Sequence, residues 1–155
     1  MRKPNRLATF DHSTPNAYFI TVCTKNREQL LWKDVGAAIG RLQAPELSAY
    51  GNIVEQAIKR IPEYYPEITV DKFVVMPDHI HLLLQIQSAG SGSSETVAIS
   101  RVIQQMKGAV TKQAGISFWQ KGFYDHVIRC EEDYQETWAY IEANPGRWAE
   151  RNGGR

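Results

Sequence analysis

The sequence predicts an α+β domain built on one antiparallel sheet. Four short segments are rich in apolar, β-branched and aromatic residues, which is typical of strands. Between and after them, apolar residues recur at spacings of three and four, which is typical of amphipathic helices. The resulting order is strand, helix, strand, strand, helix, strand, helix. This is the order of a split βαβ unit, the ferredoxin-like arrangement, with one additional C-terminal helix.

The composition is that of a folded protein with a single core. Of the 155 residues, 43% are hydrophobic and 23% are charged, so we expect one domain over residues 1–155. The chain contains no apolar run of membrane-spanning length and no signal-peptide pattern at its start, so we expect a cytoplasmic protein with no membrane partner. The net charge of +1 gives no overall attraction to nucleic acid, so any such site must be local.

The first half of the chain contains three predicted strands and one predicted helix. Residues 17–24 (AYFITVCT) are rich in β-branched and aromatic types and predict the first strand. Apolar residues at helical spacing predict a helix over 52–61, ended by Pro62. Residues 68–76 (ITVDKFVVM) and 79–87 (HIHLLLQIQ) predict two strands that a tight connection joins into a β-hairpin.

The second half begins with a flexible loop at about 88–95, which is rich in serine and glycine. An apolar stripe from residue 97 to residue 110 then predicts a second helix, which Gly115 should close. A short strand is expected at 123–128. Three acidic residues begin a last helix that should run over 131–144. Pro145 and the glycine after it are expected to end this helix.

Two histidines on the third predicted strand are the first candidates for chemistry. His79 and His81 are two residues apart on that strand, so their imidazoles should face the same side. Two neutral imidazoles on one side can take adjacent positions on a divalent ion, and a third ligand is then required. Such a pair also occurs where two histidines only cover a sheet edge.

The last predicted helix carries a tyrosine and an asparagine on one face. Tyr140 and Asn144 are four residues apart and therefore lie one above the other. If that face lies over the histidines, Asn144 can supply an oxygen ligand and Tyr140 can reach a phosphate bound to the ion. The alternative is a core tyrosine followed by a helix-terminal asparagine. Tyr134 is out of phase with Tyr140 and is expected to be structural.

Five sequence blocks together resemble one known family. In order along the chain, they are FITVCTKNR, VVMPDHIHLLL, ISRVIQQMKGAVTK, WQKGFYDHVIR and YIEANPGRW. In this order and at these separations they resemble the single-tyrosine HUH transposases, and within them the REP-associated tyrosine transposase branch. The resemblance covers most of the chain, and five blocks are far more specific than the histidine pair alone.

The resemblance implies a ferredoxin-like fold and a metal-dependent transposase. His79 and His81 would bind Mg²⁺ or Mn²⁺, Asn144 would be the third ligand, and Tyr140 would attack single-stranded DNA. The family reaction forms a covalent 5′-phosphotyrosine and a free 3′-hydroxyl, usually at or near a hairpin. Relatives occur as monomers and as homodimers, so the tyrosine could serve its own subunit or a partner.

Further residues are candidates for the nucleophile and for DNA contacts. Tyr124 lies close to a histidine on the last predicted strand and is the second candidate for the nucleophile. Basic side chains are expected to neutralise DNA phosphates: Arg101, Lys107, Lys112, Lys121 and Arg129. Aromatic side chains that could stack on unpaired bases are Trp119, Phe123 and Tyr124, although core packing is preferred for Phe123.

Two other classes of function stay open at this point. One is a domesticated module that binds hairpin DNA or RNA without turnover. The other is a structural or regulatory dimer in which the histidine pair is incidental. The presence of both histidines, the tyrosine and the asparagine together favours the enzyme.

Overall fold

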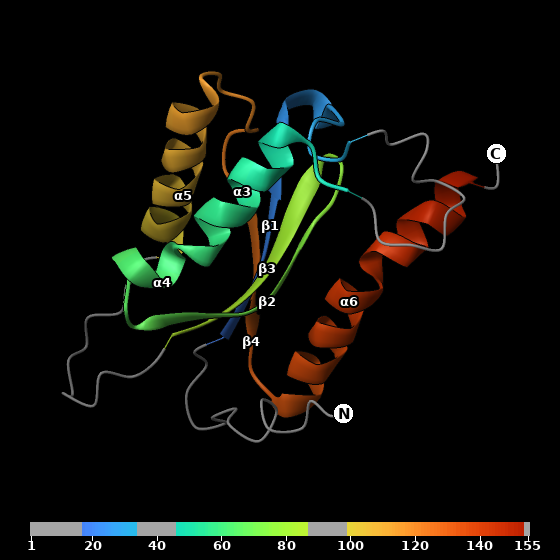
Figure 1. The fold of residues 1–155 in the computed structure, drawn as a ribbon. Coiled ribbons are helices and arrows are strands. Elements are labelled where there is room, and N and C mark those ends of the chain that lie inside the picture. The colour runs from blue at the N-terminus through green and yellow to red at the C-terminus, as the bar shows by residue number, and fades with distance from the viewer. Residues whose placement is uncertain (1–16, 34–45, 87–98, 154–155) are drawn as a thin grey trace.

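The computed structural model describes residues 17–33, 46–86 and 99–153, in which a four-stranded antiparallel sheet lies between helices (Figure 1). The strands follow the spatial order β2-β3-β1-β4. Their bounds are β1 Ala17–Cys23, β2 Ile68–Val75, β3 His79–Ile86 and β4 Tyr124–Ile128. A short 3-10 turn, η1 (Lys25–Arg27), follows β1. The helices are α3 Ala49–Lys59, α4 Ile61–Tyr64, α5 Ile99–Ala114 and α6 Glu131–Gly153. The predicted α+β class and element order are confirmed.

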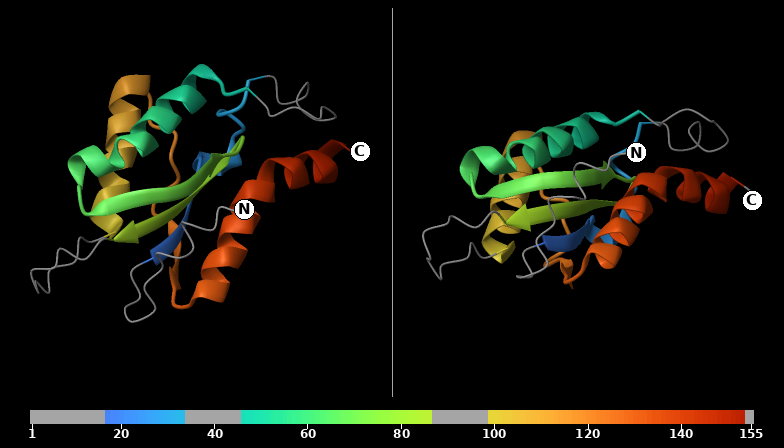
Figure 2. Two further views of the ribbon diagram at one scale, coloured as in Figure 1. Left: turned by 60° about the horizontal axis from the view of Figure 1, so that its bottom comes forward. Right: turned by 90° about the horizontal axis from the view of Figure 1, so that it is seen from below.

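Helices cover both faces of the sheet. Figures 1 and 2 show α3 and α5 on one face and α6 on the other. The main core lies beneath α3 and α5, and a smaller cluster lies between the sheet and α6. Burial of each large apolar side chain stabilises the fold by roughly 1.5 to 3 kcal/mol. The face under α6 has fewer such residues, because histidines and threonine occupy part of it.

Two helix boundaries differ from the sequence-based expectation. The last helix was expected to stop at Asn144, but α6 continues through Pro145 to Gly153. Proline removes one backbone hydrogen bond and crowds one carbonyl, which a helix can accommodate by bending. In Figure 1 the axis of α6 changes direction along its last part. Proline is therefore a bend here and not a stop.

The first helix begins earlier than expected. Ser48 caps α3, since its side chain accepts a hydrogen bond from the backbone of Gly51 at 3.0 Å. Pro62 does not end this helix; it stands in the first turn of α4, where a missing N–H is tolerated. The capping serine was the signal for the true start.

Other expectations agree with the structure or lie outside it. The buried residues of α5 are the ones predicted from its apolar stripe. The helix ends at Ala114, directly before Gly115, whose φ is +82°. The expected loop at 88–95 and the start of that helix at residue 97 lie outside the described residues. Within the described ranges, no helix combines the length and the apolar character needed to cross a bilayer.

Replacing Gly51 with alanine should destabilise the protein by about 2 to 3 kcal/mol. A Cβ atom at this position would lie 2.1 Å from the carbonyl oxygen of Leu31, which also accepts a hydrogen bond from Ser48 at 2.9 Å. The matched control is Gly108→Ala on α5, where an added Cβ meets nothing within 4 Å. This substitution should stabilise the protein by about 0.5 to 1 kcal/mol. Urea unfolding curves measure both. If both substitutions changed the free energy of unfolding equally, the close approach of Gly51 to the Leu31 carbonyl would be contradicted.

Candidate active site

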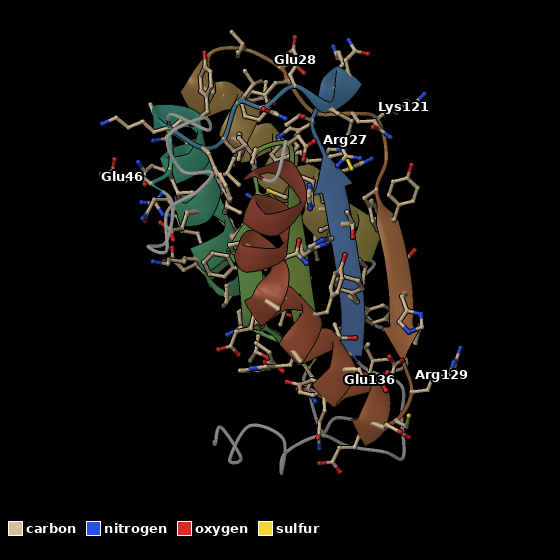
Figure 3. The ribbon with its side chains drawn as sticks, turned by 90° about the vertical axis from the view of Figure 1, so that its right-hand side faces the viewer. Arg27, Glu28, Glu46, Lys121, Arg129 and Glu136 are labelled. Carbon is tan, nitrogen blue, oxygen red and sulfur yellow. The ribbon has the colours of Figure 1, made fainter. Side chains whose placement is uncertain are left out.

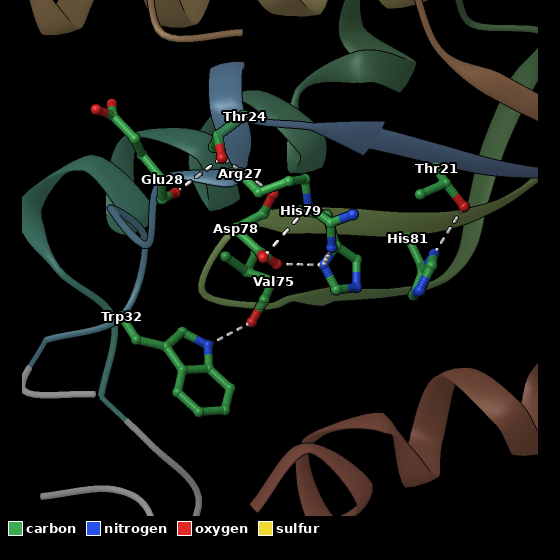
Figure 4. Close-up of polar contacts among 9 residues, drawn as sticks. All are labelled: Thr21, Thr24, Arg27, Glu28, Trp32, Val75, Asp78, His79 and His81. Atoms are coloured by element: carbon green, nitrogen blue, oxygen red, sulfur yellow. Dashed lines mark hydrogen bonds and ion pairs between the residues drawn. The ribbon is translucent and has the colours of Figure 1, made fainter. Parts of the chain in front are cut away.

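Two histidine side chains project from the central strand β3 toward α6 (Figure 4). His79 and His81 alternate with apolar residues, so the strand sends both to one face, with ring centroids 4.7 Å apart. Ile80 and Leu82 point the other way, into the main core. Both imidazoles are largely buried, with 7% and 6% exposure. The sheet itself therefore holds the pair side by side.

The Nδ1 atom of His79 contacts the carboxylate that precedes it. It lies 2.7 Å from Oδ1 of Asp78, and because an ionised carboxylate only accepts, Nδ1 is the donor. Burial raises the pKa of Asp78, but the hydrogen bond to His79 and the ion pair with Arg27 outweigh burial and hold this pKa below its usual value. With Nδ1 facing the carboxylate, Nε2 is the ring nitrogen of His79 that could offer a lone pair to a metal.

The Nδ1 atom of His81 contacts a hydroxyl on the adjacent strand. Thr21 is opposite His81 in the β1–β3 register, and its Oγ1 lies 2.9 Å from Nδ1. Burial, followed by the charges of His79 and Arg27, lowers the pKa of His81 to about 3. The ring is therefore neutral at physiological pH. If the hydroxyl accepts from Nδ1–H, Nε2 of this ring also presents a lone pair.

Helix α6 carries Tyr140 to the histidines of the same chain. The ring centroid of Tyr140 lies 5.5 Å from that of His81 and 6.0 Å from that of Phe19. Its side chain is 42% exposed, so the phenol is accessible from solvent. Asn144 is one turn further and only 5% exposed. Its amide nitrogen donates to the Tyr140 carbonyl at 3.1 Å, which identifies the other end of the amide as the oxygen.

Contacts with strand β2 anchor α6 on its own sheet. Tyr134 is fully buried, and its hydroxyl donates to the carboxylate of Asp71. Lys72 lies 3.6 Å from Glu142 and 4.9 Å from the ring centre of Trp138. The expectation that Tyr134 is structural agrees with its burial. These contacts hold α6, which carries Tyr140, against the sheet of the same chain.

The donors at this site fit a cation that binds nitrogen and oxygen. Two imidazole nitrogens can occupy adjacent positions, and oxygens must supply the others. Within the described ranges, no group of three histidine, cysteine or acidic side chains is arranged to hold a metal. The remaining donors would therefore be the amide oxygen of Asn144, water and a substrate phosphate.

Tyr124 lies on the same face of the sheet but further from the histidines. It is opposite Thr21 in the β1–β4 register, and Thr21 is opposite His81. Two strand spacings separate Tyr124 from His81, which corresponds to about 10 Å. Tyr124 is 61% exposed. Tyr140 is therefore the tyrosine nearer to the histidines, and Tyr124 is an exposed aromatic residue further from them.

The basic residues of α5 do not surround this site. Arg101 and Lys112 are exposed on α5, which covers the opposite face of the sheet (Figure 1). Lys107 was expected to bind a DNA phosphate, but its ammonium donates to the carbonyls of Gln120 at 2.9 Å and Gly122 at 2.8 Å. Burial also lowers the pKa of Lys107. Lys107 is thus a support for the loop before β4.

Lys121 and Arg129 lie at opposite ends of β4. Both are exposed, and Figure 3 shows Lys121 at the end of the sheet where Arg27 lies, with Arg129 at the other end. The register agrees, because β4 begins opposite Thr21 and ends opposite Ala17. Of these two residues, Lys121 is the one at the end of the sheet that holds the histidines.

The expectation that Trp119 stacks on a DNA base is wrong for this structure. Its side chain is 6% exposed and belongs to the main core, so neither ring face is available to a base. Phe123 packs against the same core, as preferred from the sequence. The apolar surface of these rings is used for packing, and Tyr124 is the exposed aromatic residue of the block.

Sequence reasoning missed three residues that contact the histidines. Asp78 is adjacent to His79 in the chain, and that adjacency was a usable signal. Thr21 and Arg27 are 60 and 52 residues away from the rings that they contact. Their proximity requires the strand register, which spacing in the sequence does not give.

Comparisons with known proteins bear on the family and the fold of this chain. The sequence model of the family described as IS200-like transposases matches residues 14–144. An uncharacterized protein of Haemophilus influenzae is 30% identical over 95% of this chain and 89% of its own length. The REP-associated tyrosine transposase of Escherichia coli is 24% identical over 83% of this chain and 65% of its own length. A REP-associated tyrosine transposase solved with a REP hairpin is 23% identical, with a TM-score of 0.65 over 90% of this chain and 72% of that one.

Proposed function

Because the chain belongs to the IS200-like transposase family, we propose that it cleaves and rejoins single-stranded DNA with Tyr140 as the nucleophile. His79, His81 and Asn144 would hold a Mg²⁺ or Mn²⁺ ion. The observation that carries this proposal is the 5.5 Å separation between the rings of Tyr140 and His81. A phenol from the last helix and an imidazole pair from the middle of the sheet lie close together in one chain.

The tyrosine performs a phosphoryl transfer. Its hydroxyl oxygen forms a bond to the phosphorus of a phosphodiester, and the bond from that phosphorus to the 3′ oxygen breaks. The leaving strand takes up a proton and ends in a 3′-hydroxyl, while the 5′ phosphate stays on Tyr140. Because the new bond is again a phosphoester, a 3′-hydroxyl can attack it and rejoin the strand without ATP.

The protein residues bind and orient the phosphate. When bound, the divalent ion withdraws charge from the phosphate oxygens and so favours attack. His79 and His81 are held through Nδ1 by Asp78 and Thr21, which leaves both Nε2 atoms for the ion. The exposed side of Tyr140 leaves room for DNA to approach. Fixed geometry matters because reacting atoms must come within about 3 to 3.5 Å.

The substrate is proposed to be single-stranded DNA next to a hairpin. The similar solved structure contains a REP hairpin, which makes hairpin-flanked DNA the first substrate to test. Tyr124 lies on the same face of the sheet as the histidines. Lys121 lies at the same end of the sheet as the histidines. We propose that Tyr124 stacks on an unpaired base and that Lys121 contacts a phosphate. Arg101, Lys112 and Arg129 would contact only DNA that extends beyond the site.

The test is the formation of a covalent adduct. Hairpin-flanked single-stranded DNA labelled at its 3′ end, which the retained fragment carries, is incubated with the protein and Mn²⁺, and the products are separated on a denaturing gel. We expect a labelled protein–DNA species that disappears with a chelator and returns when Mn²⁺ is restored. The same assay is repeated with the hairpin made of RNA. If the protein binds the DNA and the RNA hairpin but forms no adduct, a nucleic-acid-binding module without turnover would be supported instead.

A further inference from the structure

An arginine from the turn after β1 contacts the histidine site from one side. Arg27 places Nε 3.2 Å from Oδ2 of Asp78, while Oδ1 of the same carboxylate lies 2.7 Å from Nδ1 of His79 (Figure 4). Nη2 of Arg27 lies 3.4 Å from the same Nδ1, a weak contact at most. The carboxylate is thus held at both oxygens by two different residues.

Holding both oxygens restricts the carboxylate more than holding one. A carboxylate bonded through a single oxygen can rotate about its terminal bond, because that torsion is broad. With Arg27 on the second oxygen, Asp78 keeps one orientation, and the ring that donates to it keeps one as well. Asp78 is only 6% exposed, so water is a poor replacement for the guanidinium.

The backbone around this turn is already held by other contacts. The backbone N–H of Thr24 donates to the Asp78 carbonyl at 3.0 Å, and its hydroxyl lies 3.1 Å from the same oxygen. The N–H of Leu31 donates to the Pro77 carbonyl at 3.0 Å. These bonds fasten the segment after β1 to the connection between β2 and β3. The guanidinium is therefore not needed to keep the two loops together.

The turn bears an unfavourable backbone conformation at two successive residues. Asn26 and Arg27 have φ values of +57° and +55°, in the left-handed region that glycine prefers. Asparagine tolerates this region better than most residues, and arginine does not. A side chain kept at such a position is a reason to look for a role of that side chain near the site.

We propose that Arg27 is a positioning residue, which fixes the carboxylate of Asp78 and through it the imidazole of His79. The proposal rests on the proposed function, since it assigns the purpose of this orientation to presenting Nε2 of His79 to the ion. Arg27 itself contacts neither the ion nor the reacting atoms. Outer contacts of this kind change metal affinity by about 10-fold to 100-fold when they are removed.

The turn offers a matched pair of variants. Arg27→Gly relieves the left-handed backbone, which stabilises the protein, but it also removes the cation beside a buried carboxylate, which destabilises it. Urea unfolding curves therefore accompany the binding assay. Asn26→Gly relieves the same backbone conformation at the neighbouring residue and keeps the guanidinium. We expect Arg27→Gly to weaken Mn²⁺ binding about tenfold, and Asn26→Gly to leave it unchanged. Arg27→Lys, which can still pair with one oxygen, should fall between them. Calorimetric titration with Mn²⁺ alone measures these affinities.

A second readout does not depend on the metal. Nitrogen-15 spectra of the imidazoles in metal-free protein report which ring nitrogen of His79 carries the proton. The wild type and Asn26→Gly should show Nδ1 protonated, and Arg27→Gly should show a mixture of both forms. Wild-type ring signals together with wild-type Mn²⁺ affinity in Arg27→Gly would overturn the proposal. A wild-type protein that binds no Mn²⁺ would count against the proposed function, and the ring spectra would still decide the role of Arg27.

Discussion

Replacing Tyr140 with phenylalanine is expected to abolish the covalent adduct and to lower strand cleavage at least about a thousandfold. The substitution removes only the hydroxyl, which is the atom that forms the bond to phosphorus. A thousandfold loss corresponds to about 4 kcal/mol of activation free energy. Tyr140 is 42% exposed, so the free energy of unfolding should change by about 1 kcal/mol or less. Denaturing gels and urea unfolding curves measure the two quantities.

The matched control is Tyr124→Phe on the same face of the sheet. Tyr124 is more exposed than Tyr140 and two strands away from His81. Its phenylalanine variant keeps the aromatic ring, so the adduct should persist and DNA affinity should change little. The opposite result, with the adduct lost in Tyr124→Phe and kept in Tyr140→Phe, would transfer the nucleophile to β4.

Much of the fold is encoded in local patterns of the sequence. The segment HIHLLLQI is mostly apolar, and it is the fully buried strand β3 inside the sheet. The apolar stripe of α5 also predicted its buried face. These features are local, since a strand or helix period depends on residues close in the chain. The stop expected at Pro145 was wrong, because a proline can bend a helix when the residues after it remain helical.

The candidate site was predictable only in part. Periodicity placed His79 and His81 on one face, and helical spacing placed Tyr140 and Asn144 on one face. These two faces meet because Tyr134 and other residues hold α6 against the sheet. Spacing in the sequence alone does not reveal those contacts. The contacts within one subunit now support convergence, while the catalytic and metal-binding roles stay predictions.

The DNA contacts were the least predictable part. Lys107 and Trp119 are residue types that often bind nucleic acid, yet the fold uses one to hold a loop and the other in the core. Arg101 and Lys112 lie on a helix that covers the face opposite the histidines. The position of a basic residue in the sequence does not indicate which face of the sheet it will occupy. Arg27 was overlooked for the same reason, because its ion pair is with Asp78, which lies far from it in the sequence.

Replacing His81 with alanine should also abolish cleavage, and mixing this variant with Tyr140→Phe should not restore it. His81→Ala removes one imidazole of the pair, so Mn²⁺ affinity and cleavage should both fall at least about a hundredfold. It also removes the hydrogen-bond partner of Thr21, at a cost of about 1 to 2 kcal/mol in the free energy of unfolding. Unfolding curves therefore accompany the assay, to establish that the variant is folded at the working temperature.

The mixture determines which subunit supplies the tyrosine. In this structure Tyr140 lies 5.5 Å from His81 of its own chain, and α6 is fastened to its own β2 through Tyr134 and Asp71. Every site in the mixture then lacks either the imidazole of His81 or the hydroxyl of Tyr140. Mixing the two variants therefore cannot produce a complete site. If α6 instead served a partner in an exchanging homodimer, mixed dimers would regain one intact site, or about a quarter of wild-type activity at random exchange. Recovery near that level, with size-exclusion chromatography showing dimers, would contradict a site completed within one chain.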